Sequence, residues 1–158
     1  MPNYEPRAIA NEFIKLNRGR MDQTKLQKLV YIAHGWNLAI NRESLVEGSI
    51  EAWDGGPVMR SIWNHLRDFG YNAAGGLLGK TRSEPFVADL SISERAIIEH
   101  TWKKYNLYSG LELSKMTHQP GTPWTSAYFG KGRNCPISNV DIQNHFTEMA
   151  IAGRQAAH

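Results

Sequence analysis

The stretch that decides the fold runs from Asp22 to Ile40 and reads DQTKLQKLVYIAHGWNLAI. Asp22 is suited to start a helix, because its carboxylate accepts a hydrogen bond from a free backbone N–H group of the first turn. Apolar residues then recur at helical spacing and form one inward face. They are Leu26, Leu29, Val30, Ala33 and Ile40. This pattern predicts a long, buried helix at the centre of the fold.

Three residues of this segment predict how the helix packs. Lys25 and Lys28 fall outside the apolar face, so we expect both on the solvent side of the helix. Gly35 lies inside the helix, where glycine costs about 1 kcal/mol relative to alanine. The close approach of another backbone or an aromatic ring at this position would explain the glycine.

Capping signals and apolar spacing predict five further helices around the central one. Three of them carry a capping-box pattern, in which a serine at the helix start is followed three residues later by an acidic residue. These pairs are Ser91 with Glu94, Ser109 with Glu112, and Ser138 with Asp141. The five predicted segments are about 6–17, 57–69, 91–105, 109–116 and 138–150.

The helix after residue 56 is predicted from a proline and a glycine at its two ends. It is expected to begin at Pro57, because the first turn of a helix tolerates a missing N–H group. Val58 and Phe69 are expected on its apolar face, and Gly70 is expected to end it.

These signals together predict a mainly α protein, a single compact domain over residues 1–158 with about six helices. A small β element of one or two short strands is expected near residues 45–53. Residues 71–90 are rich in glycine and predict a long loop, with at most a short strand at residues 86–87.

The composition is that of a globular domain, and it indicates which cellular compartment and which class of partner to expect. Of the 158 residues, 41% are apolar and 21% are charged. The lone Cys135 suits a reducing compartment, and no apolar run approaches the length of a membrane helix, so we expect a cytoplasmic protein. The net charge is only +3 and no run of five Lys or Arg residues occurs, which disfavours nucleic acid as a partner.

Residues that catalyse reactions or bind metals form no recognisable pattern. The six His residues lack the H-E-x-x-H spacing of zinc sites. Cys135 and His118 are a conceivable nucleophile and base, but the surrounding RNCP resembles no protease or phosphatase loop. GGLLGKT at residues 75–81 falls short of a P-loop, because Ala74 stands where the first glycine belongs. We therefore expect no catalytic site, metal or cofactor, and a protein that acts by binding another protein.

Two segments combine tryptophan, glycine and proline beside predicted helix ends. They read EAWDGGPV at residues 51–58 and THQPGTPW at residues 117–124. In one interpretation each is a rigid turn whose tryptophan fills the core. In the other, Trp53, Pro57, His118 and Trp124 form an exposed ledge for a partner, because rigid aromatic residues are favoured at interface hot spots.

Several motifs of this sequence carry a family resemblance when they are taken in order. They are ANEFI at residues 10–14, KLQKLVYIAHGW at 25–36, EAW and GPV at 51–58, LS and TH at 113–118, PW at 123–124, and IS, DI and F at 137–146. In this order and at these separations, the motifs resemble the Panacea antitoxin domain, the family of SocA-like antitoxins and related phage-associated proteins. The likeness spans nearly the whole chain.

The resemblance implies an antitoxin of a toxin–antitoxin or phage-defence module, which neutralises a cognate toxin encoded nearby by direct binding. Some members of the family carry an additional DNA-binding region, which we do not expect here because the domain fills the chain. The motifs and the two loops nominate ten partner-binding residues. They are Lys25, Gln27, Trp36, Trp53, Gly56, Pro57, Thr117, His118, Pro123 and Trp124.

Two alternative functions stay open on the sequence alone. A DNA-contacting phage or transcriptional regulator would place Arg18, Arg20, Lys25 and Lys28 near phosphates at one end of the central helix. A proteolysis adaptor would bind its partner in the same way as an antitoxin and deliver it to a protease.

Overall fold

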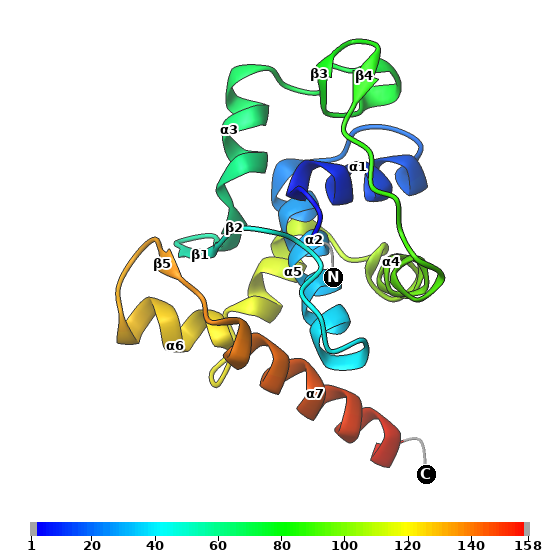
Figure 1. Ribbon diagram of the computed structural model, residues 1–158. Coiled ribbons are helices and arrows are strands. Elements are labelled where there is room, and N and C mark those ends of the chain that lie inside the picture. Colours follow the sequence, from blue (N-terminus) through cyan, green and yellow to red (C-terminus); the bar gives the residue numbers. More distant parts are fainter. Residues whose placement is uncertain (1–2, 157–158) are drawn as a thin grey trace.

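Helix α2 (Gln23–Ile40) is the central element of the fold, and most other helices pack around it (Figure 1). The structure is a computed structural model that describes residues 3–156. Seven α-helices and two small antiparallel sheets make up this part of the chain. The prediction of a mainly helical protein with a small β element is confirmed, with one helix more than expected.

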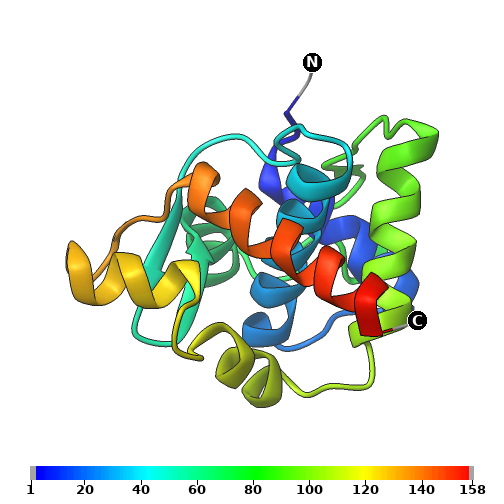
Figure 2. The ribbon, with the colours of Figure 1, turned by 90° about the horizontal axis from the view of Figure 1, so that it is seen from below.

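The remaining elements are short and follow one another closely along the chain. The helices are α1 (Pro6–Asn17), α3 (Arg60–Asp68), α4 (Ile92–Tyr105), α5 (Gly110–Thr117), α6 (Pro123–Gly130) and α7 (Asn139–Ala156), with a 3-10 helix η1 (Ala74–Gly76). The strands are β1 (Ile50–Trp53), β2 (Gly56–Met59), β3 (Gly79–Thr81), β4 (Glu84–Pro85) and β5 (Cys135–Pro136). One sheet has the order β2–β1–β5 and the other pairs β3 with β4. Figure 2 shows α7 lying across α2.

The start and the middle of α2 follow the sequence prediction, whereas Ile40 at its end is 54% exposed and its predicted place on the inward face is wrong. The Asp22 carboxylate accepts a hydrogen bond from the backbone N–H of Lys25 at 3.0 Å, so Asp22 is the expected cap. At Gly35 the ring of Phe146 from α7 lies so close that a Cβ atom would stand 2.2 Å from it. The glycine therefore lets an aromatic ring of α7 reach the backbone of α2.

Lys28 contradicts the predicted solvent face of α2. Its side chain is only 2% exposed, whereas Lys25 is partly exposed as expected. The prediction assumed that one face of α2 stays in water, but β2 and α5 both pack against this helix. Because these elements cover the side of α2 that carries Lys28, its position outside the apolar face does not keep it in solvent.

The third helix starts later than predicted, because the residues before it form a strand. Gly56–Met59 pairs antiparallel with β1, and α3 begins directly after it, so Pro57 and Val58 are strand residues. The backbone partners that β1 supplies come from outside the segment and override its local preference. Phe69 is 65% exposed, so its predicted place on the apolar face is also wrong. Gly70 ends the helix as predicted, with a φ of 65°.

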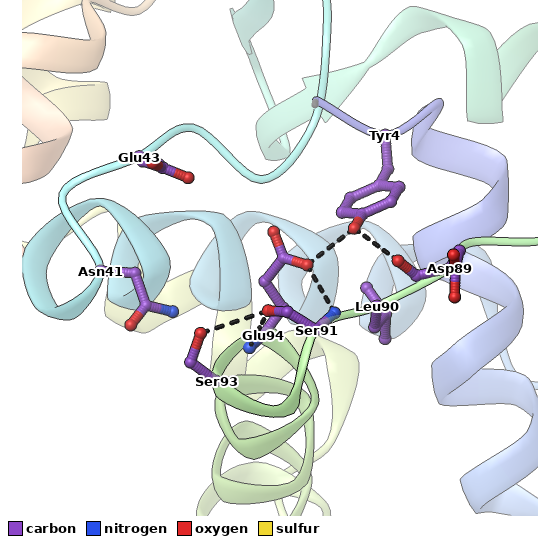
Figure 3. Close-up of a pocket in the computed structure, with 8 residues that line it drawn as sticks. All are labelled: Tyr4, Asn41, Glu43, Asp89, Leu90, Ser91, Ser93 and Glu94. Carbon is purple, nitrogen blue, oxygen red and sulfur yellow. Dashed lines mark hydrogen bonds between the residues drawn. The ribbon is translucent and has the colours of Figure 1, made fainter. Parts of the chain in front are cut away.

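Two predicted capping boxes start helices α4 and α5. In each, the serine hydroxyl accepts the N–H group of the glutamate, and the glutamate carboxylate accepts the N–H group of the serine. The pairs are Ser91 with Glu94 and Ser109 with Glu112. Figure 3 shows the first box, where Glu94 also accepts a hydrogen bond from the Tyr4 hydroxyl at 2.7 Å. At the start of α7, the Ser138 hydroxyl accepts the N–H group of Asp141 at 3.4 Å.

Residues 71–90 do not form the long loop that their glycines predicted. They contain η1 and the β3–β4 hairpin, and the short strand expected at residues 86–87 is absent from this described segment. The glycines serve the compact turns of the segment: Gly75 and Gly76 both adopt positive φ angles, of 77° and 79°.

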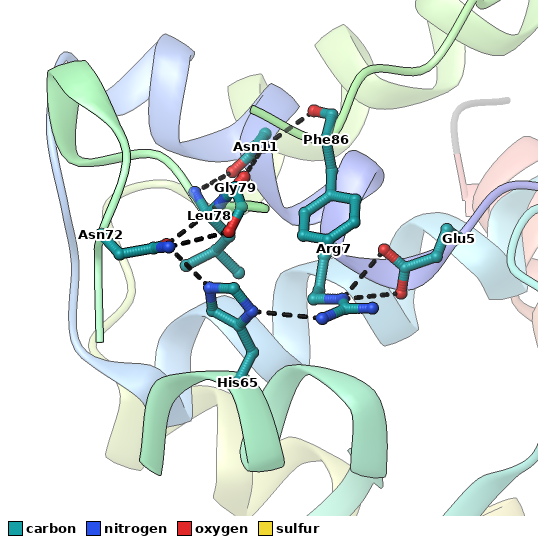
Figure 4. A network of polar contacts seen from close by, with 8 residues as sticks. All are labelled: Glu5, Arg7, Asn11, His65, Asn72, Leu78, Gly79 and Phe86. Atoms are coloured by element: carbon teal, nitrogen blue, oxygen red, sulfur yellow. Dashed lines mark hydrogen bonds and ion pairs between the residues drawn. The ribbon is translucent and has the colours of Figure 1, made fainter. Parts of the chain in front are cut away.

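Side chains from α1 and α3 hold this hairpin against the body of the protein (Figure 4). The Asn11 amide donates to the carbonyls of Leu78 and Phe86 at 2.8 Å and accepts the N–H group of Leu78 at 2.8 Å. His65 of α3 bonds to the side chain of Asn72, which in turn pairs with the backbone of β3. Asn11 lies 67 residues before Leu78, so the local pattern of residues 71–90 carries no sign of this support.

Helix α6 is the element that the sequence analysis missed. The segment before it was interpreted as a loop, yet the Thr122 hydroxyl accepts the N–H group of Thr125 at 3.3 Å and Pro123 occupies the first turn. A cap followed by a proline is a helix start, so the signal was present in the sequence.

Among residues 3–156, no helix is both long enough and apolar enough to cross a membrane.

Candidate protein-binding surface

The two segments with tryptophan, glycine and proline meet where the β1–β2 hairpin packs beside α5 and α6. The indole N–H of Trp124 donates to the carbonyl of Trp53 at 2.7 Å. The ring of His118 lies on Trp124 with 3.9 Å between centroids, and its Nε2 is 2.9 Å from the carbonyl oxygen of Asp54. We call this set of four residues and their contacts the hairpin corner.

Most of the predicted site residues in the hairpin corner and directly beside it are buried. Trp124 is only 4% exposed and therefore fills the core, whereas Trp53 is half-buried. Gly56 has a φ of +120°, and a Cβ atom there would stand 2.5 Å from the Cε atom of Lys28. The neighbouring Pro57, Thr117 and Pro123 are buried as well. The rigid-turn interpretation thus describes Trp124, while part of the Trp53 ring remains open to a partner.

The three predicted site residues on α2 have different surroundings. The Gln27 amide accepts the N–H group of Met59 at 2.9 Å and donates to its carbonyl at 3.2 Å, so it ties α2 to β2. Lys25 Nζ donates to the carbonyl of Asn106 at 2.6 Å, and Trp36 is buried against α7. Gln27 therefore supports the hairpin, whereas Lys25 and Trp36 lie outside the corner. Partner binding by the ten nominated residues stays a prediction.

Lys28 carries an ammonium group into the interior beside the hairpin. Its Nζ donates to the carbonyl of Pro57 at 3.4 Å, and burial lowers the pKa of Lys28 to about 8. Because Lys28 is buried, one of the four basic residues proposed for DNA contact is not available to phosphate, whereas Lys25 is partly exposed and donates one hydrogen bond to Asn106. Arg18 and Arg20 are exposed, so DNA contact at this end of α2 stays an untested alternative.

A row of four side chains on β1 and α3 has two tryptophans in the middle and an arginine at each end. The Trp53 and Trp63 rings contact each other with 5.3 Å between centroids. The guanidinium of Arg60 lies 5.3 Å from the Trp53 centroid, and that of Arg67 lies 5.0 Å from the Trp63 centroid. We call Arg60, Trp53, Trp63 and Arg67 the arginine–tryptophan row.

Glu51 fixes one end of the arginine–tryptophan row. Its Oε1 accepts the indole N–H of Trp53 at 2.8 Å and an N–H group of Arg60 at 2.9 Å. Partial burial would raise the pKa of Glu51, but the hydrogen bonds from Arg60 and Trp53 outweigh it and lower the pKa. The carboxylate therefore stays ionised at neutral pH and orients both side chains.

The row has the properties of an interface hot spot. Both indole rings are half-buried and both arginines are more exposed, so each ring is held in place while keeping surface for a partner. Tryptophan and arginine are the residue types that most often dominate binding energy. Arg60, Trp63 and Arg67 were not among the predicted site residues, although their i, i+3, i+7 spacing places them on one face of a helix.

A second aromatic cluster, formed by Trp124, Tyr128 and Phe129, lies beside the hairpin corner. Tyr128 stacks on Trp124 at 4.5 Å, and the 75% exposed Phe129 packs its ring against both. The Tyr128 hydroxyl donates to Asp54 at 2.7 Å, and Arg133 donates to both Asp54 carboxylate oxygens, at 2.9 and 2.8 Å. The hydrogen bond from Tyr128, joined by that of Arg133, lowers the pKa of Asp54. Phe129 thus presents an exposed apolar ring that is held in place by Tyr128 and Trp124.

The two side chains considered for catalysis both make structural hydrogen bonds. The Nδ1 and Nε2 atoms of His118 lie 2.6 Å and 2.9 Å from the backbone carbonyls of Ser114 and Asp54. The Cys135 thiol donates to the carbonyl of Ala127 at 3.2 Å. Within residues 3–156, no three His, Cys, Asp or Glu side chains are grouped so that they could hold a metal ion.

Comparisons with known proteins place this chain in a family. The family described as "Antitoxin SocA-like, Panacea domain" matches residues 26–125, which include most of α2, the β1–β2 hairpin, α3 and the hairpin corner. Antitoxin SocA of Caulobacter vibrioides (strain NA1000 / CB15N) is 30% identical over 117 residues, which are 69% of this chain and 61% of that relative. This chain thus spans less than two thirds of the length of that relative, and no solved structure matches it. The chain belongs to the family of SocA-like antitoxins with a Panacea domain.

Proposed function

We propose that this protein is a cytoplasmic antitoxin that neutralises a cognate protein toxin by binding it directly, without catalysing a reaction. Its membership of the SocA-like family supports the antitoxin role. The observation that carries the proposed binding mode is the arginine–tryptophan row, because it is a braced surface of the residue types that dominate protein interfaces.

The row is suited to tight binding because its side chains are ordered before the partner arrives. Trp53 is held by Glu51 and by contact with Arg60 and Trp63, so little side-chain entropy remains to be lost on binding. Each tryptophan presents a large apolar face, and each arginine adds donors for the carboxylates or carbonyls of a partner. Phe129 extends the surface with an exposed aromatic ring.

Growth on co-expression tests the function. The product of the neighbouring gene is expected to arrest growth when produced alone and to be harmless beside this chain. The Trp63→Ala and Arg67→Ala variants are expected to lose protection. Leu107→Ala is the matched control, because Leu107 is 92% exposed but lies after α4, outside the row. A neighbouring product that is harmless alone, or that stays toxic beside the wild-type chain, contradicts the antitoxin role.

Binding measured with purified proteins tests the mechanism. Trp63→Ala is expected to weaken the complex by about 2 kcal/mol or more, the range of hot-spot truncations, while Leu107→Ala leaves the affinity within a few-fold. Protection without a stable complex would instead mean that toxin activity is suppressed by another route.

A further inference from the structure

A pocket of about 250 Å³ lies between α2, the end of α4, the turn from α5 to α6, and α7. Helix α7 crosses α2 beside this turn, and α5 also packs against α2 (Figure 2). We call it the aromatic pocket, because three aromatic rings form part of its wall. Six residues of its lining are at most 6% exposed: Tyr31, Ile32, Tyr105, Thr117, Thr122 and Phe146.

The packing of α7 on α2 fixes the rings of the aromatic pocket. The ring of Phe146 lies directly against the backbone of Gly35, at a distance that leaves no room for a Cβ atom. Its centroid lies 5.2 Å from that of Trp36 and 5.9 Å from that of Tyr31, with an edge-to-face arrangement in both pairs. The space is therefore formed before a ligand arrives, and a ligand spends little free energy on ordering it.

The lining of the aromatic pocket carries no charge. All of it lies within the described residues, and it contains no Asp, Glu, Lys or Arg. Burial lowers the pKa of His145 more than the nearby Glu148 raises it, so this ring of the lining is uncharged at neutral pH. A charged ligand would lose its hydration without gaining an ion pair from the lining. The pocket is suited to an uncharged ligand.

Two polar groups of the aromatic pocket are not used by the fold. Tyr31 is only 3% exposed, yet neither its hydroxyl nor the His145 ring forms a hydrogen bond with any residue that the structure describes. Burial raises the pKa of Tyr31, so the hydroxyl keeps its proton and remains a donor. The hydroxyls of Thr117 and Thr122, in contrast, donate to the carbonyls of Ser114 and Thr117 at 2.7 and 2.8 Å. A ligand with one hydroxyl would supply the partner that Tyr31 lacks.

The volume of the aromatic pocket sets the size of the ligand. An apolar cavity of about 150 Å³ is large enough to hold a benzene molecule. At about 250 Å³ this pocket has room for one aromatic ring with short substituents.

We propose that the aromatic pocket binds a small, uncharged phenol from solution, whose hydroxyl group pairs with the Tyr31 hydroxyl. The ring of the ligand would pack edge to face against the aromatic side chains of the wall. Met116 and Met149 also line the pocket, and their flexible thioether side chains adapt well to an aromatic ring. Because no residue of the lining belongs to the arginine–tryptophan row, this site is independent of the proposed antitoxin function.

A free molecule suits the aromatic pocket better than a side chain of a partner protein. Small-molecule sites enclose most of the surface of their ligand. The buried part of the lining would surround a bound ring in this way. A tyrosine side chain would also have to bring its main chain to the mouth of a pocket that has room for little more than the ring.

NMR titration of the full chain with three ligands of nearly the same shape tests the proposal. The probe is 4-methylphenol, and the controls are toluene, which lacks the hydroxyl, and 4-methylbenzoate, which is charged. We expect 4-methylphenol to shift the amides of residues 117–122 and 145–149, and toluene to bind about fivefold more weakly. We expect 4-methylbenzoate to leave these amides in place. Absence of shifts with 4-methylphenol, or equal shifts with 4-methylbenzoate, overturns the proposal.

A variant that lacks only one hydroxyl assigns the hydrogen bond. Tyr31→Phe is expected to bind 4-methylphenol about fivefold more weakly and toluene as tightly as the wild type does, because the ring of the wall remains. Unchanged binding of toluene also shows that the pocket is still folded. Tyr108→Phe is the matched control, a partly exposed tyrosine outside the pocket. If 4-methylphenol keeps its advantage over toluene in Tyr31→Phe, the assignment is wrong.

A capped amino acid separates a free ligand from a side chain of a polypeptide. N-acetyl-L-tyrosine amide is expected to bind at least about tenfold more weakly than 4-methylphenol, because the pocket has no room for its main chain. Equal or tighter binding of the tyrosine amide would identify a tyrosine side chain of a partner as the occupant and overturn the proposal of a free phenol.

Discussion

Lys28 carries a charge into the interior, where its hydrogen bond to the Pro57 carbonyl is 3.4 Å long. Burial lowers its pKa to about 8 in the folded state, compared with 10.5 for a free lysine side chain. Between these values the unfolded chain binds more protons than the folded chain, so the free energy of unfolding rises with pH. On acidification the free energy of unfolding falls, because the folded protein then holds a desolvated ammonium group that opposes folding.

Replacing Lys28 by methionine is expected to remove this pH dependence. From pH 8 to pH 9.5 the wild-type free energy of unfolding is expected to rise by about 1.5 kcal/mol, and that of Lys28→Met to stay nearly flat. Urea unfolding at the two pH values measures both. Lys25→Met is the matched control on the same helix and should keep the wild-type slope. A slope shared by all three proteins would show that Lys28 is not its source.

His34 is expected to control the free energy of unfolding at acidic pH, as Lys28 does at alkaline pH. Its Nδ1 accepts the N–H groups of Leu45 and Val46 at 3.2 Å, and its Nε2 lies 2.9 Å from the side-chain oxygen of Asn139. Burial lowers the pKa of His34, and the hydrogen bond to Asn139 only partly offsets this. Because the unfolded chain takes up the proton first, stability is expected to fall as the pH drops below about 6.5.

A His34→Gln variant tests this assignment. It is expected to be less stable than the wild type at pH 7 by about 1–2 kcal/mol, through lost hydrogen bonds, but to lose less stability between pH 7 and pH 5.5. Thermal unfolding across this range provides the measurement. His100→Gln, at an exposed position, is the control and should follow the wild-type curve.

At the scale of elements, glycine positions decide how closely two helices pack. Gly35→Ala would place a methyl group 2.2 Å from the Phe146 ring, so α7 must move away from α2. We expect a loss of about 1–3 kcal/mol, as in other over-packed cores. Gly153→Ala is the matched control in α7, because no atom lies within 4 Å of its added Cβ. In calorimetry Gly153→Ala is expected to be slightly more stable than the wild type, since alanine favours the helix more than glycine does.

Asn11 is the side chain that joins α1 to the β3–β4 hairpin. Asn11→Ala removes three hydrogen bonds to the backbone of Leu78 and Phe86, two of which involve buried atoms. We expect a loss of about 3 kcal/mol and faster amide hydrogen exchange across residues 72–86. Asn17→Ala, on the exposed end of the same helix, should leave the exchange rates unchanged. Slow exchange in Asn11→Ala would mean that other contacts hold the hairpin.

At the scale of the whole molecule, the hairpin corner and the arginine–tryptophan row separate folding from binding. Trp124 is buried and bonded to Trp53, whereas Trp63 is half-buried at the surface. Trp124→Ala is therefore expected to lose about 3–5 kcal/mol of stability, the cost of removing a large buried ring. Trp63→Ala should lose much less and still fail to protect cells. If Trp63→Ala unfolds as readily as Trp124→Ala, its loss of protection says nothing about binding.

Local chemistry was sufficient to predict most helices of this protein. A serine and a glutamate three residues apart, as at Ser91 and Glu94, start a helix through bonds made within one turn. Asp22, Gly35 and Gly70 likewise fulfil the roles that their types suggested. The family resemblance also depends on sequence alone, and the comparisons confirm it.

Contacts between distant segments decided the rest. Lys28 became buried because β2 and α5 cover its side of α2, and Pro57 joined a strand because β1 supplied the backbone partners. Half-burial of Trp53 and Trp63, in contact with two arginines, likewise depends on how the hairpin lies beside α3. The sequence by itself determined where most helices begin and end, since caps and turns act over a few residues, but the start of α3 depended on the pairing of β2 with β1. Tertiary structure alone decided which side chains reach solvent, because burial depends on segments that only folding brings together.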